Sequence, residues 1–109
     1  MPAYWIARAR IHEPARYWNY ASQVPGIIAR YGARVLARGG DYDTVEGADT
    51  FSRFVVIEFP SLDSARRCFH SPEYQAARAH RLDGVGNAEI TLVYGGEFSS
   101  PEGLAAAAR

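Results

Sequence analysis

The sequence predicts an α+β fold in which strands and helical regions follow one another in the order β-α-β-β-α-β. Four stretches show the two-residue alternation or the short apolar run that is typical of strands. Two helical regions show apolar residues at helical spacing, and each begins at a proline or a serine of the kind that starts helices. The chain of 109 residues has the length of one domain. Its folding should bury roughly 65% of the surface that the unfolded chain exposes.

The first strand is expected over residues 3–10, because larger and smaller side chains alternate there with a period of two. The first helix is expected over Pro14–Tyr31, where apolar residues recur at helical spacing. Pro25 lies inside this pattern and cannot donate a backbone hydrogen bond, so we expect a kink or a break near Val24. Gly32 is expected to close the helix, since a left-handed residue is favoured at that position.

The connection between the second and third strands is expected to be irregular. The second strand covers residues 33–39, and Gly40-Asp41 indicates a bend or a bulge after it. The pattern allows this strand to resume over residues 42–47. The third strand covers residues 53–59, and Pro60 ends it because proline lacks the N–H group that a strand ladder uses.

The second helical region is divided into two helices by a proline. Ser61 is expected to cap the first of them, and the second is expected over about Pro72–Leu82. The last strand is expected over residues 89–94. We therefore expect a single domain over residues 1–97, followed by a frayed C-terminal tail over residues 98–109.

This order of elements predicts the ferredoxin-like arrangement, an antiparallel sheet with the helices packed on one face. Right-handed crossover connections place both helical regions on the same side. Side-chain parity then divides the strand residues between two faces. The face expected under the helices contains Trp5, Ala7, Ala9, Val35, Ala37, Val55, Ile57, Phe59 and Val93. The opposite face is expected to contain Tyr4, Ile6, Arg8, Leu36, Arg38, Phe54, Val56, Glu58, Ile90, Leu92 and Tyr94.

The face opposite the helices is largely apolar, although in a lone monomer it would contact water. An apolar patch of this size is larger than a soluble monomer usually exposes. A second copy that packs sheet against sheet would cover it. We therefore expect a homodimer with a two-fold interface.

Three charged residues, Arg8, Arg38 and Glu58, are expected on this apolar face. Glu58 belongs to a central strand, and an arginine partner, with Arg38 beside it, would hold its carboxylate ionised. One interpretation is a buried ion pair that fixes the dimer, in which loss of one partner typically costs about 3–5 kcal/mol. The other interpretation is that Glu58 is a polar anchor in a ligand pocket.

Composition narrows the functions that we expect. Twelve arginines, with no lysine, balance twelve acidic residues, so the sequence lacks the basic excess that nucleic-acid binding requires. The single cysteine, Cys68, excludes an internal disulfide and indicates a small buried side chain in a helix. The histidines lack the spacing of metal ligands, and we expect neither a metal nor a cofactor. Without a membrane-spanning run or a signal-peptide pattern, the expected location is the cytoplasm.

The chain contains, in order, the stretches YWIARARI, YGARVLARGG, RFVVIEFPS, SPEYQAAR and a last strand ending in LVYG. Together they resemble the domain of unknown function 1330 family over residues 3–97. The resemblance implies a ferredoxin-like subunit of the dimeric alpha-beta barrel superfamily, in which two sheets pack face to face. Ala33 stands where the family pattern usually has a second glycine. The positions that match the family pattern are Arg38, Gly39, Gly40, Glu46, Glu58, Phe59, Pro60, Ser71, Pro72, Tyr74 and Arg78.

The leading hypothesis is a homodimeric barrel protein that binds a small organic molecule in a cleft of each subunit. Arg38 and Glu58 would anchor the polar end of the molecule. Tyr74, Arg78 and His70 would lie at the rim. An alternative is a cofactor-free enzyme of the monooxygenase, isomerase or cyclase type, with Glu58 or His70 as general base. A third hypothesis is a structural dimer without a site, and the fold alone does not choose among the three.

Overall fold

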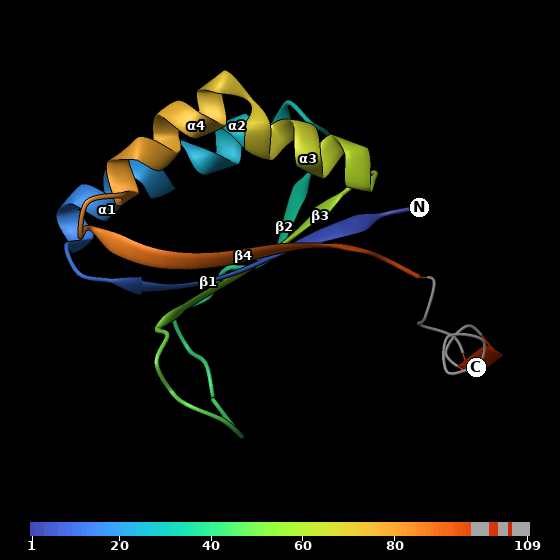
Figure 1. Ribbon diagram of the computed structural model, residues 1–109, viewed down its shortest axis with the longest axis horizontal. Helices are drawn as coiled ribbons and strands as arrows, with labels where there is room; N and C mark the ends of the chain where they lie inside the picture. Colours follow the sequence, from blue (N-terminus) through green and yellow to red (C-terminus); the bar gives the residue numbers. More distant parts are fainter. Residues whose placement is uncertain (97–100, 103–104, 106–109) are drawn as a thin grey trace.

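Helices on one side of a four-stranded antiparallel sheet make up the computed structural model, which describes residues 1–96, 101–102 and 105 (Figure 1). The strands are β1 (Ala3–Ile11), β2 (Arg34–Ala37), β3 (Arg53–Phe59) and β4 (Gly86–Tyr94). The helices are α1 (Pro14–Ala21), α2 (Val24–Ala29), α3 (Leu62–His70), α4 (Pro72–Arg78) and the short 3-10 helix η1 (Ala79–Arg81). The tail expected over residues 98–109 lies outside the described residues except at positions 101, 102 and 105.

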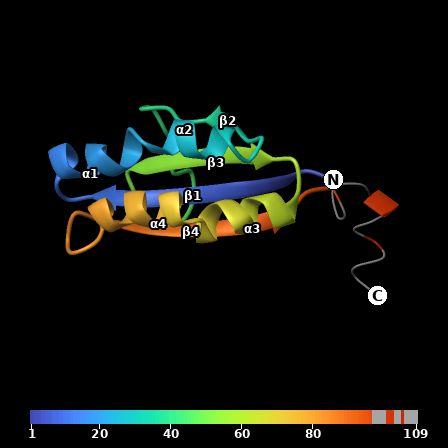
Figure 2. The same ribbon diagram turned by 90° about the horizontal axis from the view of Figure 1, so that it is seen from above.

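The strand order is β2-β3-β1-β4, and each neighbouring pair is antiparallel. This order, with the helices on one face, is the ferredoxin-like fold, so the predicted α+β arrangement is confirmed. The central strand β1 pairs with both β3 and β4, and its Trp5 lies opposite Ile57 and Leu92. Seen from above, α1 and α2 follow one long edge of the sheet, while α3 and α4 follow the other (Figure 2).

The break expected near Val24 is confirmed. α1 ends at Ala21 and α2 begins at Val24, with Pro25 in its first turn, where a missing N–H group costs no helical hydrogen bond. Gly32 follows α2 with a φ of 75°, a left-handed conformation that glycine adopts without strain. A β-carbon at this position would also lie 3.2 Å from the ring of Pro60. The turn therefore requires glycine for two separate reasons.

Two serines determine where α3 and α4 begin. The Oγ atom of Ser61 accepts a hydrogen bond of 3.0 Å from the backbone N–H of Ser64. The Oγ atom of Ser71 accepts from the N–H of Tyr74 at 3.2 Å, and its hydroxyl donates to the carbonyl of Cys68 at 2.7 Å. Ser71 thus provides hydrogen-bond partners for a backbone carbonyl at the end of α3 and a backbone N–H at the start of α4. These two bonds hold the two helices in a fixed relation.

Trp5 is the centre of the core between the sheet and the helices, with 1% of its surface exposed. Its ring stacks on Phe59, with 5.9 Å between the centroids, and meets the edge of Tyr74 at 5.0 Å. Phe69 contacts it from α3 at 5.8 Å. These aromatic contacts join β1 and β3 to α3 and α4, and they fix the position of the second helical region on the sheet.

The second strand is shorter than the sequence predicts. Only residues 34–37 form β2, and a register shift between Val35 and Ala37 marks a bulge earlier than the expected position. Residues 39–52, hereafter the arm, form no strand, so the expected continuation over residues 42–47 is wrong. In the register that pairs Ala37 with Val56, the partner strand β3 begins only at Arg53, so residues 42–47 have no strand opposite them. The arm extends away from the sheet on the side opposite the helices (Figure 1).

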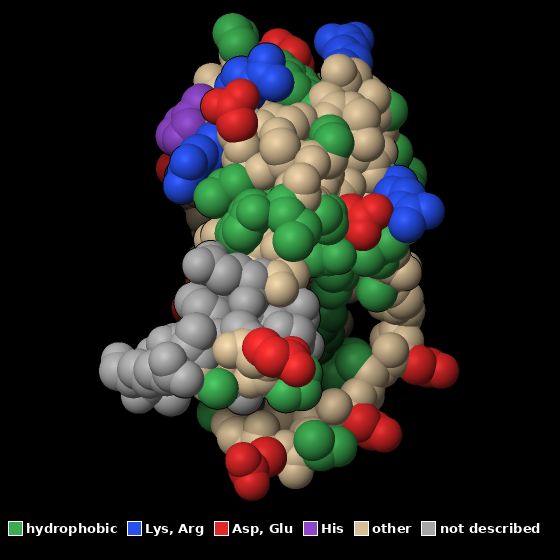
Figure 3. Space-filling model, turned by 90° about the vertical axis from the view of Figure 1, so that its right-hand side faces the viewer, with side chains coloured by type: hydrophobic (Ala, Val, Ile, Leu, Met, Phe, Trp, Pro, Cys, Tyr) green, Lys and Arg blue, Asp and Glu red, His purple; other side chains and the backbone are tan. Residues whose placement is uncertain are grey.

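The base of the arm packs on the side of the sheet opposite the helices. Phe51 lies under the guanidinium of Arg8, whose Cζ atom is 4.7 Å from the ring centroid. The ring of Tyr42 packs on Phe54 at 5.0 Å. Figure 3 shows acidic side chains at the lower end of the molecule, where the arm lies. The acidic residues of the arm are Asp41, Asp43, Glu46 and Asp49, and residues 39–52 include no arginine.

The sides of β4 are reversed relative to the prediction. Leu92 pairs with Trp5 and Val93 with Tyr4, so Leu92 and Ile90 face the helices. Val93 therefore lies on the sheet face opposite the helices, hereafter the open face, where it is 43% exposed. Both sides of this strand carry apolar residues, so alternation alone could not decide between them. The register with β1 decides which side of β4 faces the helices.

Candidate functional site

A narrow cleft lies between the sheet and the helices α1 and α2. Its empty space is about 520 Å³ with the open mouth included, but the part that water could fill is only about 40 Å³. Its walls are mainly apolar and aromatic. Because the space between them is narrow, it favours a flat molecule over a bulky one. The residues that line it are Trp5, Ala7, Arg8, Ala9, Tyr17, Tyr20, Ala21, Val24, Val35, Arg38, Arg53, Val55, Ile57, Ala88 and Ile90.

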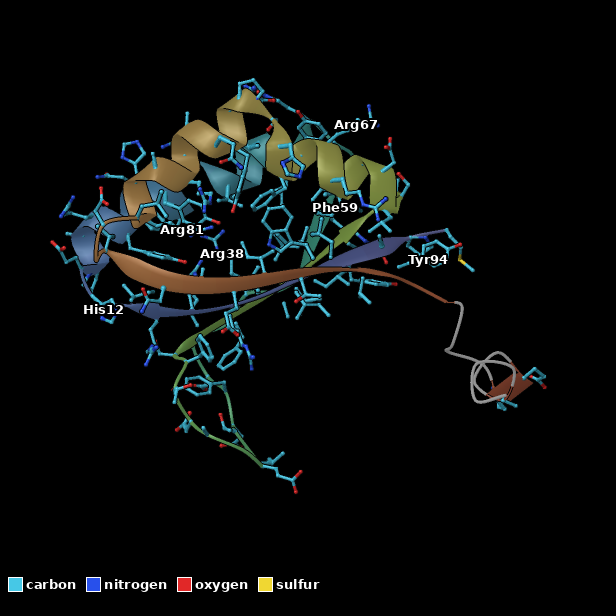
Figure 4. All side chains as sticks on the ribbon, in the orientation of Figure 1. His12, Arg38, Phe59, Arg67, Arg81 and Tyr94 are labelled. Carbon is cyan, nitrogen blue, oxygen red and sulfur yellow. The ribbon has the colours of Figure 1, made fainter. Side chains whose placement is uncertain are left out.

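Arg38 lies at this cleft and not beside Glu58. The bulge in β2 shifts the side-chain parity by one residue, which turns Arg38 to the helix side of the sheet. Its Nη2 atom there donates to the carbonyl of Ala21, the last residue of α1, at 3.5 Å. Figure 4 shows Arg38 between the sheet and the helix layer. The expected placement of Arg38 next to Glu58 is therefore wrong, because the bulge occurs before Arg38 and not after it.

Arg53, the first residue of β3, is a second cation at the cleft. Its Cζ atom lies 5.7 Å from the ring centroid of Tyr17 on α1, which is the geometry of a cation–π contact. Burial and the neighbouring Tyr20 raise the pKa of Tyr17, and Arg53 offsets only part of this rise. The Tyr17 hydroxyl therefore stays protonated at neutral pH and serves as a hydrogen-bonding group, not as a base.

A buried polar cluster of Tyr20, Tyr74 and Arg81 lies at the Tyr20 wall of the cleft. The two hydroxyl oxygens are 2.8 Å apart, and the Cζ atom of Arg81 is 5.1 Å from the ring centroid of Tyr20. Burial raises the pKa of Tyr20 above its ordinary value. Burial lowers the pKa of Arg81, but its hydrogen bonds to the hydroxyls of Tyr74 and Tyr20 and its attraction to both residues outweigh that effect, so the net pKa is raised.

Arg81 is a buried cation whose charge is not balanced by an acid. The residue is 5% exposed, and its Nε atom has no hydrogen-bond partner. Among the described residues, none of the ion pairs includes Arg81. Figure 4 shows it beneath the helix layer, on the same side of the sheet as Arg38. Its positive charge therefore adds to the field at the Tyr20 wall of the cleft.

Glu58 lies on the open face, as its parity predicts, but with a different arginine. The Nε atom of Arg34 donates to Glu58 Oε1 at 3.0 Å, and the Tyr4 hydroxyl donates to Oε2 at 3.2 Å. The carboxylate is 25% exposed, while the side chain of Arg34 is 73% exposed. Because Glu58 is held in this pair and does not line the cleft, its geometry matches the ion-pair interpretation better than the ligand-anchor interpretation.

The other candidate residues from the sequence are not gathered at the cleft. Tyr74 is fully buried and belongs to the core, not to a rim. Arg78, at the end of α4, is half-buried, and its Nε atom has no hydrogen-bond partner. His70, the last residue of α3, is exposed, and its ring meets Phe69 edge-on at 5.2 Å. None of these three is among the described residues that line the cleft, and their roles in binding stay predictions.

The sequence pattern did not single out Arg53 or Arg81 as site residues. Arg53 shares the parity of Ile57, so it is a charged residue at a position that should lie under the helices. That mismatch is the signal that could have found it. No comparable signal marks Arg81, since η1 is too short to show a periodic pattern.

Two further features are absent from the described part of the chain. No group of three or more His, Cys, Asp or Glu side chains comes together there in a way that could hold a metal ion. No helix in those residues is both long enough and apolar enough to cross a membrane. Among the residues that line the cleft, tyrosines and arginines supply hydroxyl and guanidinium groups.

Residues 2–96 match the family described as Domain of unknown function (DUF1330). The match covers the sheet and all the helices between its strands. No curated protein matches the chain.

Solved structures with the same fold include proteins of unknown function and a cofactor-independent oxygenase. The RPA0582 protein of unknown function from Rhodopseudomonas palustris is 17% identical, with 85% of this chain and 81% of that chain covered and a TM-score of 0.71. A dimeric ferredoxin-like protein of unknown function from Jannaschia sp. CCS1 is 10% identical, with 85% and 98% covered and a TM-score of 0.67. SnoaB, a cofactor-independent oxygenase from Streptomyces nogalater, is 16% identical, with 87% and 93% covered and a TM-score of 0.60. Likeness at these identities shows the fold.

Proposed function

The chain belongs to the DUF1330 family, and we propose that it binds a small, flat organic molecule in the cleft between its sheet and the helices α1 and α2. The observation that carries this proposal is the make-up of the cleft: apolar and aromatic walls with a few polar groups among them. Small-molecule sites have this composition, and their volumes run from about 300 to 1,000 Å³. The part of this cleft that water could fill, about 40 Å³, is well below that range, so the bound molecule would be thin and would lie partly in the open mouth.

The polar anchor of the bound molecule differs from the pair that the sequence predicts. Arg38 keeps its predicted role, because it lines the cleft. Glu58 lies on the other face of the sheet, and Arg53 takes its place as the second anchor. The hydroxyls of Tyr17 and Tyr20 would complete the orientation of the molecule, while Trp5 and the small alanines of β1 would contact its flat surface.

A single-tryptophan variant tests binding at this cleft. The chain has two tryptophans, and Trp18 is 60% exposed on α1, so Trp18→Phe leaves Trp5 in the cleft wall as the reporter. A metabolite library is first screened for compounds that raise the melting temperature. A compound bound in the cleft should also change the emission of Trp5.

Two alanine variants distinguish the cleft from other surfaces. Ala88→Leu narrows the cleft, and we expect it to weaken binding by about tenfold or more, a loss of about 1.4 kcal/mol. Ala15→Leu, on the exposed side of α1, is the matched control and should leave affinity unchanged. Binding that Ala88→Leu does not affect, or that leaves the Trp5 emission unchanged, contradicts the proposal.

We also propose that two copies of the chain associate through their open faces. Ile6 on β1 is 47% exposed and Val93 on β4 is 43% exposed, so this face presents apolar area from adjacent strands. Its charges are paired within one subunit, as Arg8–Glu89 at 2.8 Å and Arg34–Glu58 at 3.0 Å, which lowers the cost of removing them from water. The description of the Jannaschia protein, which shares the fold, as dimeric supports association of two copies.

A cofactor-free enzyme is the second candidate, and the description of SnoaB as a cofactor-independent oxygenase supports it. The predicted bases, Glu58 and His70, do not line the cleft, and its lining contains no carboxylate or imidazole. Dioxygen uptake in the presence of compounds from the screen would reveal such an activity. If uptake occurs and Glu58→Gln abolishes it without changing affinity, Glu58 acts as the base.

A further inference from the structure

We propose that the cleft selects molecules that carry a carboxylate, with Arg38 and Arg53 binding that group together. This inference rests on the proposed function, since it names the class of molecule that the cleft takes. The inference arises from the excess of positive over negative side chains in the cleft lining. The lining contains arginines but no aspartate, glutamate or histidine.

The two arginines are available for a ligand. Among the described residues, no ion pair includes Arg38 or Arg53. Arg38 has a long hydrogen bond of 3.5 Å to a backbone carbonyl, and Arg53 contacts the Tyr17 ring at 5.7 Å and hydrogen-bonds to the Tyr17 side chain, so neither guanidinium is bound to a carboxylate. The third lining arginine, Arg8, is different because its guanidinium is bound to Glu89 at 2.8 Å.

The sheet places Arg38 and Arg53 on neighbouring strands at the same end of the sheet. Arg38 follows the last residue of β2, and Arg53 is the first residue of the neighbouring strand β3. Ala37 pairs with Val56, so Arg38 continues the edge strand next to the start of β3. Arg53 shares the parity of Ile57, and Arg38 follows Ala37, whose partner Val56 has the opposite parity, so both arginines lie on the helix side of the sheet, at the two ends of the arm.

A buried charge behind the cleft reinforces the preference for an anion. Arg81 is 5% exposed and contacts the Tyr20 ring at 5.1 Å, and Tyr20 lines the cleft. A site with one sign of charge and low-polarity walls concentrates its field on the ligand. A neutral or cationic molecule would leave these charges uncompensated.

The chemistry of the donors favours a carboxylate over a phosphate. Planar guanidinium groups match the two oxygens of a carboxylate through paired hydrogen bonds. Phosphate sites usually add free backbone N–H groups at a helix N-terminus or a glycine-rich loop. The backbone at this cleft comes largely from strands, and the N–H groups of a paired strand are used in the ladder.

Paired probes of equal shape test the inference. Naphthalene-2-carboxylate and naphthalene-2-carboxamide are titrated by calorimetry against the full chain carrying Trp18→Phe, with the Trp5 emission as the reporter of location. We expect the carboxylate to bind at least about tenfold more tightly, since hydrogen bonds to charged groups exceed neutral ones by about that much. Arg38→Gln and Arg53→Gln should each remove most of this preference, lowering the affinity for the carboxylate by a larger factor than the affinity for the carboxamide.

Arg66→Gln serves as the control, since Arg66 is exposed on α3 and does not line the cleft. Equal binding of the two probes, or a carboxylate preference that persists in the Arg38→Gln/Arg53→Gln double variant, overturns the inference while the proposed function stands. Failure of both probes to alter the Trp5 emission counts against the proposed function itself and against the inference with it.

Discussion

At the scale of single residues, the contacts of Tyr74 determine how the core and the cleft are connected. Its ring meets Trp5 at 5.0 Å and its hydroxyl lies 2.8 Å from that of Tyr20. The same hydroxyl accepts a hydrogen bond from Arg81, which stabilises the buried cation. One side chain of α4 thus supports the aromatic core on one side and the wall of the cleft on the other.

Removing the Tyr74 hydroxyl should lower the free energy of unfolding substantially, although only one oxygen atom is lost. Tyr74→Phe keeps the ring but takes a partner from Tyr20 and from Arg81, both of them buried. We expect a loss of about 1–3 kcal/mol in the free energy of unfolding, measured by urea denaturation. Tyr42→Phe, on the exposed arm, should change stability by less than about 0.5 kcal/mol. Equal effects of the two changes would contradict the role assigned to the cluster.

Cys68 and the tyrosines make stability sensitive to alkaline pH. Burial, with a smaller contribution from Glu73, raises the pKa of the Cys68 thiol from 9.0 to about 11. The unfolded chain loses this proton first, so the stabilisation is complete below pH 9 and is lost as pH rises toward 11. Burial also raises the pKa of Tyr17 and Tyr20 from 10.0, which adds to the loss above pH 10.

The free energy of unfolding should therefore fall by about 2 kcal/mol or more between pH 9 and pH 11. Urea titrations at a series of pH values measure this slope. Cys68→Ala lowers the baseline through lost packing, but its slope over the same range should be shallower than that of the unchanged chain. Parallel slopes would show that the thiol is not the titrating group.

At the scale of elements, the stability of the short helices in this fold comes from contacts at their ends and not from their length. α2 has 6 residues and α4 has 7, which is too short for a helix to be stable alone in water. The hydroxyl of Tyr31, just after α2, donates to Glu73 of α4 at 2.9 Å and ties the two helical regions together. Ser71 supplies the second connection, between α3 and α4.

Ser71→Ala should cost about 1–2 kcal/mol in the free energy of unfolding. Ser71 is 5% exposed, so the change leaves the N–H of Tyr74 without the side-chain acceptor at the start of α4. Thermal and urea denaturation measure the loss. Ser22→Ala, at an exposed position after α1, is the control, and it should leave stability nearly unchanged. A cost for Ser71→Ala no larger than that of the control would mean that packing alone holds α4.

At the scale of the whole molecule, the two faces of the sheet have separate roles. The helix side holds the cleft with its arginines, while the open face holds exposed apolar residues and paired charges. The arm leaves the sheet between Arg38 and Arg53 and packs its base on the open face, through Phe51 beneath Arg8. It is the segment that connects the proposed ligand site to the proposed dimer interface.

A charge introduced into the open face should separate the two copies. Ile6→Glu places a carboxylate in the centre of that face, and we expect a change from about twice the chain mass of 12.0 kDa to that mass. Size-exclusion chromatography with light scattering at micromolar concentration gives the readout. Trp18→Glu makes a similar exchange on the helix side and should remain dimeric. A stable monomer for the unchanged chain contradicts the interface.

Local signals in the sequence were sufficient for most of the architecture. Pro25, Ser61, Ser71 and Pro72 act through their own backbone and side-chain chemistry, and the structure places helix boundaries at each of them. The candidate site was harder to predict. Arg38 lies on the side of the sheet opposite to the predicted one because a bulge in β2 shifts its parity, whereas the parity that Arg53 shares with Ile57 is visible within β3 alone.

The sequence by itself determined the order of elements, the antiparallel sheet with helices on one face, and the apolar character of both faces. These follow from periodicity and from residues that begin or end an element, which act over a few positions of the chain. Only the tertiary structure decided which face Arg38 occupies and which arginine pairs with Glu58. A bulge of one residue in β2 turns Arg38 toward the cleft and leaves Arg34 to pair with Glu58. The physical reason is that side chains alternate with a period of two, so one extra residue in a strand reverses every assignment after it.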